Sequence, residues 1–332
     1  MKHTAKPPCH TARLLAAAAL ASFATLPAYA ADPSPADLVD ALNGVFGQHA
    51  GARGSHAKGF CARGSFTPSA HARTLTSARI FGAGTVPAEI RFSVAGGNPA
   101  ASDKSRSARG LAVRLADGQE TWDMVFISEP VFFAATPASF VSFLQARVAD
   151  PATKKPDPAK IAAHNERFPE GKTQLALLAA HAAPSSYATT PYFSNHAFRF
   201  VGGEGGARFA RLQFEPLAGT HYLSEDEEKT LPGEFLQDEL GTRLAREAAA
   251  FDLYAQPAAD GDALTDSSVQ WSRTPAKVLL GRLTVTAVTG QDCAGSVYMP
   301  TQLPAGIEPS DDPVLKARAP AYAVSAARRA PR

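Results

Sequence analysis

The sequence has little cysteine and no large excess of charge of either sign. Three cysteines occur among its 332 residues, and only Cys61 and Cys293 lie beyond the first 30. In an oxidising compartment two thiols allow one disulfide but no disulfide framework, and the sequence leaves their pairing open. Lysine and arginine total 33, against 31 aspartate and glutamate. Since no basic stripe accompanies this balance, nucleic acid and other polyanions are not expected as partners.

The sequence also lacks a hydrophobic run of full membrane-spanning length near its start. The apolar run from Leu14 to Leu26 is shorter than the roughly 20 residues that cross a bilayer. Basic residues precede this run, and the tripeptide Ala28-Tyr29-Ala30, with a small residue at each end, follows it as a cleavage site. This order is typical of a secretory signal peptide over residues 1–30, and a transmembrane anchor is the alternative. Cys9 precedes the run, so it is not a lipid-attachment cysteine.

Export and cleavage would leave a single domain. No Arg-Arg pair precedes the apolar run, which argues against the export route for folded, cofactor-loaded proteins. Cleavage after Ala30 would leave 302 residues, of which 30 are basic and 31 acidic. No internal repeat, low-complexity tract or linker divides them. We therefore expect one domain over residues 31–332 in the periplasm, with no membrane contact after cleavage.

Hydrophobic periodicity predicts a mixed chain of the α+β class. Ser34-Pro35-Ala36-Asp37 is a capping box with proline at the first helical position, and apolar residues follow it at helical spacing. Apolar residues then alternate with polar or small ones over 90–94, 111–115 and 122–126. Further strands are expected over 197–201, 209–214 and 279–288. Such a series favours an antiparallel β-barrel over alternating helix and strand units.

Helices are expected within and after this series of strands. The patterns predict helices over 136–149 and 234–251, and a loop rich in proline and lysine over 150–160. A final helix is expected to begin at Ser310 as its N-cap, with Asp311 and Asp312 in the first turn, where the helix dipole favours negative charge. Pro320 removes one backbone donor from that helix and should bend or loosen it.

The final helix carries four polar residues at positions i, i+4, i+7 and i+11, namely Arg318, Tyr322, Ser325 and Arg329. This spacing places a phenol between two guanidinium groups on one helix face. Taken singly, the residues have ordinary explanations, because a tyrosine can seat a terminal helix and arginines can form its solvated face. His56 could likewise be an exposed loop histidine. A phenol has an unperturbed pKa of about 10, so a phenolate at neutral pH needs a positive partner such as Fe(III), with an arginine assisting. Tyrosinate is a recognised axial ligand of haem iron.

Five segments of the sequence resemble the haem-binding segments of monofunctional catalases. In chain order they are Arg53-Gly54-Ser55-His56-Ala57-Lys58-Gly59, Ile90-Arg91-Phe92-Ser93-Val94-Ala95-Gly96, Arg109-Gly110-Leu111-Ala112-Val113, Trp122-Asp123, and Pro304-Ala305-Gly306-Ile307-Glu308-Pro309-Ser310 followed by Asp312, Arg318 and Tyr322. The segments keep the family's order over about 270 residues, which is a stronger signal than any one of them. The resemblance implies a catalase-like antiparallel β-barrel with flanking helices and a C-terminal helix that carries the haem ligand.

The resemblance assigns roles on both faces of a haem b, which the chain would acquire after export. Tyr322 would be the axial ligand of the haem iron, with Arg318 as its partner. His56 would be the distal acid–base residue, oriented by Ser93. The other residues that the resemblance places around the haem are the propionate partners Arg53, Arg91 and Arg329, the apolar distal residues Phe132 and Phe140, and the pair His196 and Asp312, which would hold Arg318.

The sequence departs from typical catalases in two respects. It is much shorter and lacks their wrapping segments and C-terminal helical domain, so it resembles the small catalase-related peroxidases. Catalases also carry a distal asparagine after the Trp-Asp pair, and Ile127 aligns with it. Ser128 is the nearest polar substitute. Loss of that hydrogen-bond donor should weaken the handling of a second peroxide, so vigorous dismutation is not expected.

The resemblance therefore implies a haem peroxidase that reduces hydrogen peroxide or organic hydroperoxides with a small organic electron donor, and has weak catalase activity at most. His56 would act as general base and then as general acid. A haem isomerase or peroxidase for lipid hydroperoxides is an alternative, because Ser55 places a hydroxyl beside His56. An ordinary catalase and a noncatalytic haem or apolar-ligand binder are the others, and the binder would have no use for the pair of His56 and Ser93. We expect a monomer or a small homo-oligomer.

Overall fold

The computed structural model describes residues 1–5, 32–203, 206–271 and 276–330. The chain divides into two compact units, residues 1–31 and 32–332. Most of the expected signal peptide, residues 6–30, lies outside the described residues. Within the described ranges no helix is long and apolar enough to cross a membrane. The description below concerns the larger unit.

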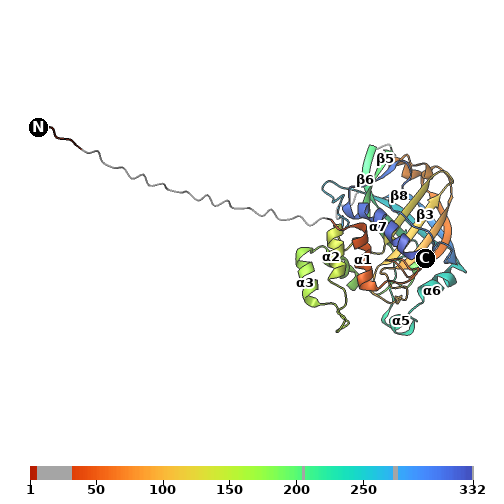
Figure 1. Cartoon of the computed structure of the whole chain (residues 1–332). Coiled ribbons are helices and arrows are strands. Elements are labelled where there is room, and N and C mark those ends of the chain that lie inside the picture. Colours follow the sequence, from red (N-terminus) through yellow and green to blue (C-terminus); the bar gives the residue numbers. More distant parts are fainter. Residues whose placement is uncertain (6–31, 204–205, 272–275, 331–332) are drawn as a thin grey trace. The chain divides into compact units, whose positions relative to one another are not determined.

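An antiparallel β-barrel forms the centre of the larger unit (Figure 1). Among the described residues, eight strands follow one another in the order β4-β3-β2-β1-β8-β7-β6-β5, and β4 pairs with β5 to close the ring. The strands are β1 (Gly59–Pro68), β2 (Val86–Val94), β3 (Arg109–Ala116), β4 (Thr121–Ile127), β5 (Tyr192–Gly203), β6 (Gly206–Pro216), β7 (Ala249–Pro257) and β8 (Val278–Gly290). A short strand β9 (Ile307–Pro309) pairs with β5 outside the ring. The predicted barrel is confirmed.

Aromatic and branched side chains fill the barrel. Phe92, Leu111 and Phe126 are at most 1% exposed and belong to one continuous core. An eight-stranded barrel has an interior just wide enough for such side chains. Because successive residues of a strand point to opposite faces, the neighbours of these core residues point outward from the barrel wall. These outward-pointing residues are therefore able to line a site on the outer wall of the barrel.

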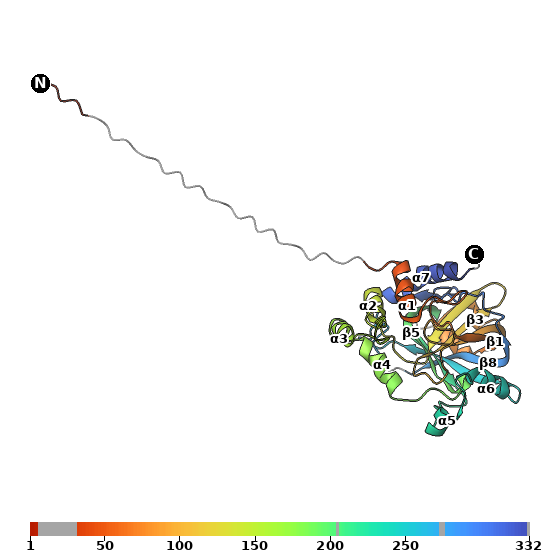
Figure 2. The same ribbon diagram turned by 60° about the horizontal axis from the view of Figure 1, so that its bottom comes forward.

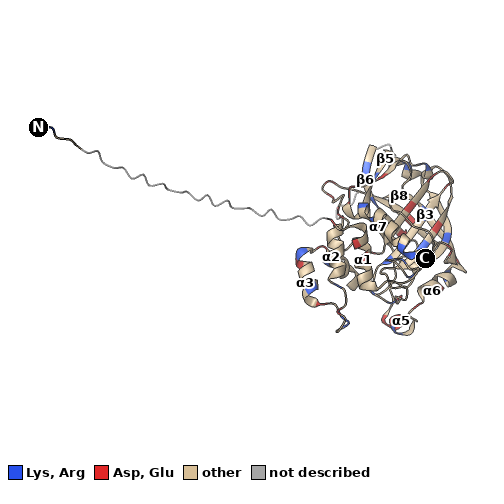
Figure 3. Cartoon of the chain, viewed as in Figure 1, with Lys and Arg blue, Asp and Glu red and all other residues tan. Residues whose placement is uncertain are grey.

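Helices cover part of that outer wall, and Figure 2 shows α1 and α7 close together on one side of the barrel. The helices are α1 (Pro35–Phe46), α2 (Pro137–Gln145), α3 (Pro158–Arg167), α4 (Gly171–Ala179), α5 (Glu225–Thr230), α6 (Leu236–Leu244) and α7 (Pro313–Arg329). Leu38 of α1 and Phe143 of α2 are buried in a second apolar cluster, against which Ala317 and Ala321 of α7 pack. Figure 3 shows basic and acidic residues interspersed along the elements, as on α3.

Several local predictions are confirmed. Ser34 forms the predicted capping box, because its Oγ accepts from the Asp37 amide and the Asp37 carboxylate accepts from the Ser34 amide. The strands predicted over 90–94, 111–115 and 122–126 lie within β2, β3 and β4. The helix predicted over 136–149 is present as the shorter α2, with Thr136 as its N-cap.

Three element boundaries were predicted wrongly. The segment 234–251 is not one helix, because α6 ends at Leu244 and β7 begins at Ala249. The segment 150–160 is not entirely a loop, because α3 begins at Pro158. The final helix is capped by Asp312 and not by Ser310, since Asp312 Oδ1 accepts from the backbone amides of the first turn. The helix continues through Pro320.

Candidate active site

A cavity lies between the outer wall of the barrel and helices α1, α2 and α7. The space between its lining atoms measures about 1430 Å³, including the part open to solvent. About 250 Å³ of this space is open to the centre of a water molecule, and both apolar and polar residues line it. Nearly all the predicted site residues line it, namely Arg53, His56, Arg91, Ser93, Ile127, Phe132, Phe140, His196, Arg318, Tyr322 and Arg329. The fold therefore brings together residues up to about 270 positions apart.

His56 is held in an unusual backbone conformation beside the cavity. Its φ is +53°, in the left-handed region that costs a residue other than glycine roughly 1–3 kcal/mol. Arg91 stabilises the turn by donating from Nη2 to the His56 carbonyl at 3.0 Å. The ring Nδ1 lies 2.9 Å from Ser93 Oγ, which fixes the imidazole orientation. Local strain of this kind is common where a side chain has a functional orientation.

Burial and charge keep His56 neutral. Burial, followed by repulsion from Arg91, Arg318 and Arg53, lowers the pKa of His56 from 6.5 to about 3. A neutral imidazole can accept a proton at any pH well above that value. With one ring nitrogen bonded to Ser93, the other is available for proton transfer.

Gly110 makes room for this pair and was not singled out in the sequence. It lies opposite Ser93 in the antiparallel register of β2 and β3. A Cβ at position 110 would lie 2.5 Å from His56 Nδ1 and closer still to Ser93 Oγ. The sequence points to Gly110 only through its place in the catalase-like segment 109–113. Its contact with His56 depends on the strand register, which the sequence does not show.

Tyr322 lines the cavity from α7. Arg318, one helical turn earlier, donates from Nε to the phenol oxygen at 3.0 Å, and its Nη2 donates to the same oxygen. These two donors use the oxygen as an acceptor and place positive charge beside it. The predicted pairing of Arg318 with Tyr322 is therefore present in the geometry.

His196 and Asp312 contact each other more directly than they contact Arg318. His196 Nδ1 of β5 lies 2.7 Å from Asp312 Oδ2, and both residues are buried. Burial is the main cause that lowers the pKa of His196. Within the described part of the chain, the hydrogen bonds of Arg318 go to Tyr322 and neither His196 nor Asp312 is its ion-pair partner. The pair instead fixes the start of α7 against β5, so its expected hold on Arg318 is indirect.

Three arginines gather at one end of the cavity. Arg53 and Arg329 donate to backbone carbonyls of residues 294–296, and Arg91 donates to the carbonyls of His56 and Ala57. Among the residues that the structure describes, none of the three pairs with a carboxylate. Burial, together with repulsion from the other two, lowers the pKa of Arg53 to about 10. Buried charges are normally paired, so this cluster calls for an anionic ligand.

The structure separates Ile127 from its polar neighbour. Ile127 lines the cavity, whereas Ser128 does not. Ser128 Oγ accepts from the Arg109 amide at 3.0 Å and donates to Glu129 Oε1 at 3.2 Å. Ser128 is therefore no polar substitute at the cavity wall. Asn195 lines the cavity from β5, but its Nδ2 donates to the Glu129 carbonyl at 2.9 Å.

The sequence matches a known protein family over most of its length. The family model described as Catalase matches residues 38–331. The chain belongs to the catalase family. It is 36% identical over 311 residues to a protein of Synechococcus elongatus named catalase-related peroxidase, and the match covers 92% of each chain. A protein of Mycolicibacterium paratuberculosis with the same name is 37% identical over 298 residues, which are 88% of this chain and 93% of that one.

Solved catalases share the barrel and the helices around it. A fungal catalase superposes with a TM-score of 0.75 at 22% identity, over 85% of this chain and 60% of the other. Catalase A from Saccharomyces cerevisiae gives a TM-score of 0.75 at 20% identity, over 85% and 62%. This member of the family thus spans about 60% of the length of those catalases.

We predict that Gly110→Ala destabilises the chain, because the added Cβ would overlap the pair of His56 and Ser93. Overpacking of this kind typically costs about 1–3 kcal/mol of unfolding free energy, measured by chemical denaturation. Gly241→Ala is the control, because a Cβ there meets nothing within 4 Å and position 241 is helical. Equal stability of Gly110→Ala and the wild type would show that the site tolerates a methyl group at this wall.

Proposed function

We propose that this chain is an exported haem b peroxidase that reduces hydrogen peroxide or an organic hydroperoxide with a small organic donor. The observation that carries the proposal is the arrangement of the cavity: a phenol flanked by arginine, a neutral histidine bonded to a serine, and an uncompensated arginine cluster share one space. The names of the relatives from Synechococcus elongatus and Mycolicibacterium paratuberculosis support the same activity.

The residues of the cavity fit haem b chemically. Tyr322 would hold the iron, since tyrosinate is a known axial ligand and Arg318 places positive charge beside the phenol oxygen. Arg53, Arg91 and Arg329 would hold the two propionate carboxylates, which supply the anionic charge that the arginine cluster lacks. Phe132 and Phe140, whose ring planes lie within 16° of each other, provide apolar surface for a flat ring system.

The residues of the chain move protons and bind the substrate. A bound haem would supply the redox chemistry, in which a peroxide is reduced and a donor is oxidised. His56 would accept a proton from the peroxide as general base and return it to the departing oxygen as general acid. In this role His56 Nδ1–H donates to Ser93 Oγ, so the other ring nitrogen carries the proton in transit.

The apolar wall at Ile127 favours peroxidation over dismutation. Dismutation needs a second peroxide held by polar contacts, and Ile127 offers no hydrogen-bond donor at the cavity. Ser55 also lines the cavity beside His56, which keeps the processing of lipid hydroperoxides as a second candidate. A purely noncatalytic haem binder is disfavoured, because it would not need a strained, neutral His56.

Two observations support export to the periplasm. Residues 1–30 have the pattern of a cleavable signal peptide. Cys61 and Cys293 form a disulfide although they lie 232 positions apart in the sequence, which fits an oxidising compartment. The mature protein would then be the single domain over residues 31–332.

We predict that Tyr322→Phe loses haem or changes its absorption spectrum, because phenylalanine offers iron no oxygen. The measurement is the visible spectrum and the haem content of the purified protein after loading with haem b. Tyr254→Phe is the control, since Tyr254 lies on β7 away from the cavity lining. An unchanged spectrum in Tyr322→Phe would remove Tyr322 as the ligand.

We predict that His56→Ala retains haem but reacts with peroxide more slowly by a factor of roughly 10² or more, the usual scale for loss of a positioned proton-transfer group. Stopped-flow absorbance measures this reaction. In the unmodified protein the rate should not fall between about pH 7 and about pH 5, because burial, the largest cause, keeps the pKa of His56 below its ordinary value of 6.5. His164→Ala is a matched control, because His164 is also buried and bonds to a hydroxyl, that of Ser142 at 2.9 Å, outside the cavity lining.

We predict that Ile127→Asn shifts the balance from dye oxidation toward oxygen release. An asparagine would offer a second peroxide the polar contact that isoleucine lacks. Oxygen-electrode traces and oxidation of a phenolic dye, recorded side by side, measure the two reactions. Ile127→Val should leave the ratio unchanged, since it keeps the wall apolar. Oxygen release at ordinary catalase rates by the unmodified protein would contradict the peroxidase proposal and show that the chain acts as an ordinary catalase.

A further inference from the structure

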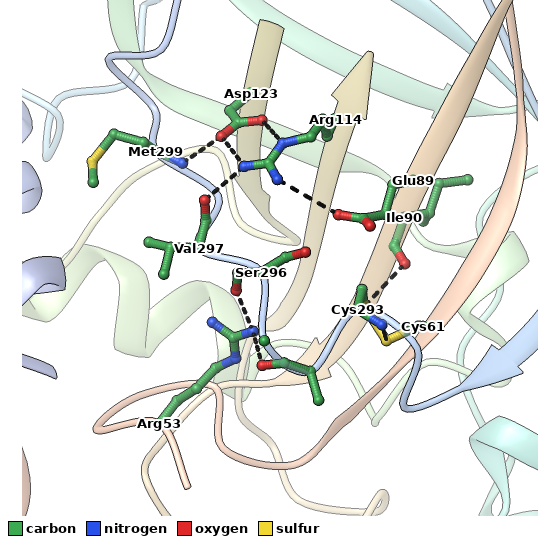
Figure 4. A network of polar contacts seen from close by, with 12 residues as sticks. Arg53, Cys61, Glu89, Ile90, Arg114, Asp123, Cys293, Ser296, Val297 and Met299 are labelled. Carbon is green, nitrogen blue, oxygen red and sulfur yellow. Dashed lines mark hydrogen bonds and ion pairs between the residues drawn. A yellow bond between two sulfur atoms is a disulfide. The ribbon is translucent and has the colours of Figure 1, made fainter. Parts of the chain in front are cut away.

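Residues 291–302, which connect β8 to the segment before β9, cross the arginine end of the cavity (Figure 4). Their backbone carbonyls bind two of the three clustered arginines. Arg53 Nη2 donates to the carbonyls of Ala294 and Ser296 at 3.2 and 2.7 Å. Arg329 Nη2 donates to the carbonyls of Gly295 and Ser296 at 3.3 and 3.5 Å. Three consecutive carbonyls thus set where these two guanidinium groups lie.

The segment is fixed to β1 on one side of these carbonyls. Cys293 forms its disulfide with Cys61 of β1, and both cysteines are at most 2% exposed. The Cys293 amide also donates to Cys61 Sγ at 2.9 Å. Gln291 Nε2 donates to the carbonyl of Gly59, at the start of the same strand, at 3.0 Å. The first anchor therefore lies directly before residues 294–296.

A second anchor lies directly after these carbonyls. Arg114 of β3 and Asp123 of β4 form a two-fold ion pair, with both N–O distances at 2.7 Å. Arg114 Nη2 also donates to the Val297 carbonyl at 2.7 Å, and the Met299 amide donates to Asp123 Oδ2 at 2.8 Å. The Asp123 amide donates to the Gln302 carbonyl at 3.0 Å. Figure 4 shows both anchors and the Arg53 contact between them.

The two anchors leave only residues 294–296 between them, so these carbonyls have little freedom. Guanidinium groups bind carboxylates well only in a defined geometry. Groups that are already in position before a ligand arrives lose less entropy when it binds. A short segment held at both ends can provide that order.

We propose that residues 291–302 act as a two-point clamp that positions Arg53 and Arg329 for the carboxylates of haem, and that the Cys61–Cys293 disulfide and the Arg114–Asp123 pair are positioning groups for cofactor retention. This inference rests on the proposed haem function. The clamp predicts that loss of either anchor speeds haem release.

Asp123→Asn tests the second anchor, and Asp252→Asn is its matched control. Both carboxylates accept two hydrogen bonds from an arginine directly across an antiparallel strand pair, Arg114 and Arg282, and both are buried. Only Asp123 bonds to residues 291–302. Transfer of haem b from the loaded protein to excess apo-globin should be about tenfold faster in Asp123→Asn, the scale of one lost hydrogen bond to a charged group. It should be unchanged in Asp252→Asn.

Further variants separate positioning from general loss of structure. In a background that lacks both positioned guanidinium groups, Arg53→Ala with Arg329→Ala, Asp123→Asn should add much less to the release rate than it does alone, because the clamp acts through these two arginines. The double variant Cys61→Ser with Cys293→Ser removes the first anchor and should also release haem faster. It tests the clamp if Asp123→Asn does not fold. Hydrogen exchange should be faster in residues 291–302 of both anchor variants.

The outcomes distinguish this inference from the proposed function. Wild-type release rates in folded variants of both anchors would overturn the clamp, and so would full additivity of Asp123→Asn with the double variant Arg53→Ala and Arg329→Ala. A wild-type chain that takes up no haem b would instead overturn the proposed function, and it would do so before any variant is compared.

Discussion

The alternation of β2, β3 and β4 is the constraint on which the site depends. Phe92, Leu111 and Phe126 point into the barrel and are buried in its core. Their neighbours Ser93 and Ile127 therefore face the helices on the other side of the wall. A shift of one residue in register would exchange the two faces, placing polar groups in the core and aromatic rings in the cavity. The packing of the barrel interior thus fixes the chemistry outside it.

The cavity combines a cluster of positively charged arginines with the neutral imidazole of His56. Burial of the imidazole lowers the pKa of His56 most, and repulsion from Arg91, Arg318 and Arg53 lowers it further. Among the described residues, no carboxylate pairs with Arg53 or Arg91. The same lack of carboxylates leaves the arginines ready for an anion. A glutamate added beside them would satisfy the arginines, compete with an anionic cofactor and favour protonation of His56. The cluster therefore stays available for an anionic cofactor, while burial of the imidazole, the largest cause of the lowered pKa of His56, does not depend on the arginines.

Local patterns predicted much of the fold, and long-range contacts account for most of what the sequence could not predict. The capping box at Ser34 and the alternation in β2 to β4 depend on neighbouring residues, so the sequence contains them. Residues 245–251 are rich in alanine and continued the helical pattern, yet pairing with β6 and β8 makes Ala249–Pro257 a strand. Ser310 and Asp312 are both good N-caps, and the contact of Asp312 with His196, 116 residues away, favours the later one.

The site, like the fold, has features that the sequence predicts and features that depend on long-range contacts. The resemblance pointed to Tyr322 and His56, but the roles of Gly110 and of residues 291–302 depend on contacts across strands and over as many as 243 positions, as between Arg53 and Ser296. Ile127 shows why such a site can change its chemistry while the fold persists. Its backbone pairs with Phe193 where β4 meets β5 and closes the barrel, while its side chain lines the cavity. Strand pairing uses backbone groups that every residue except proline provides. The closure of the barrel therefore leaves the side chain at position 127 free to set how polar the cavity is.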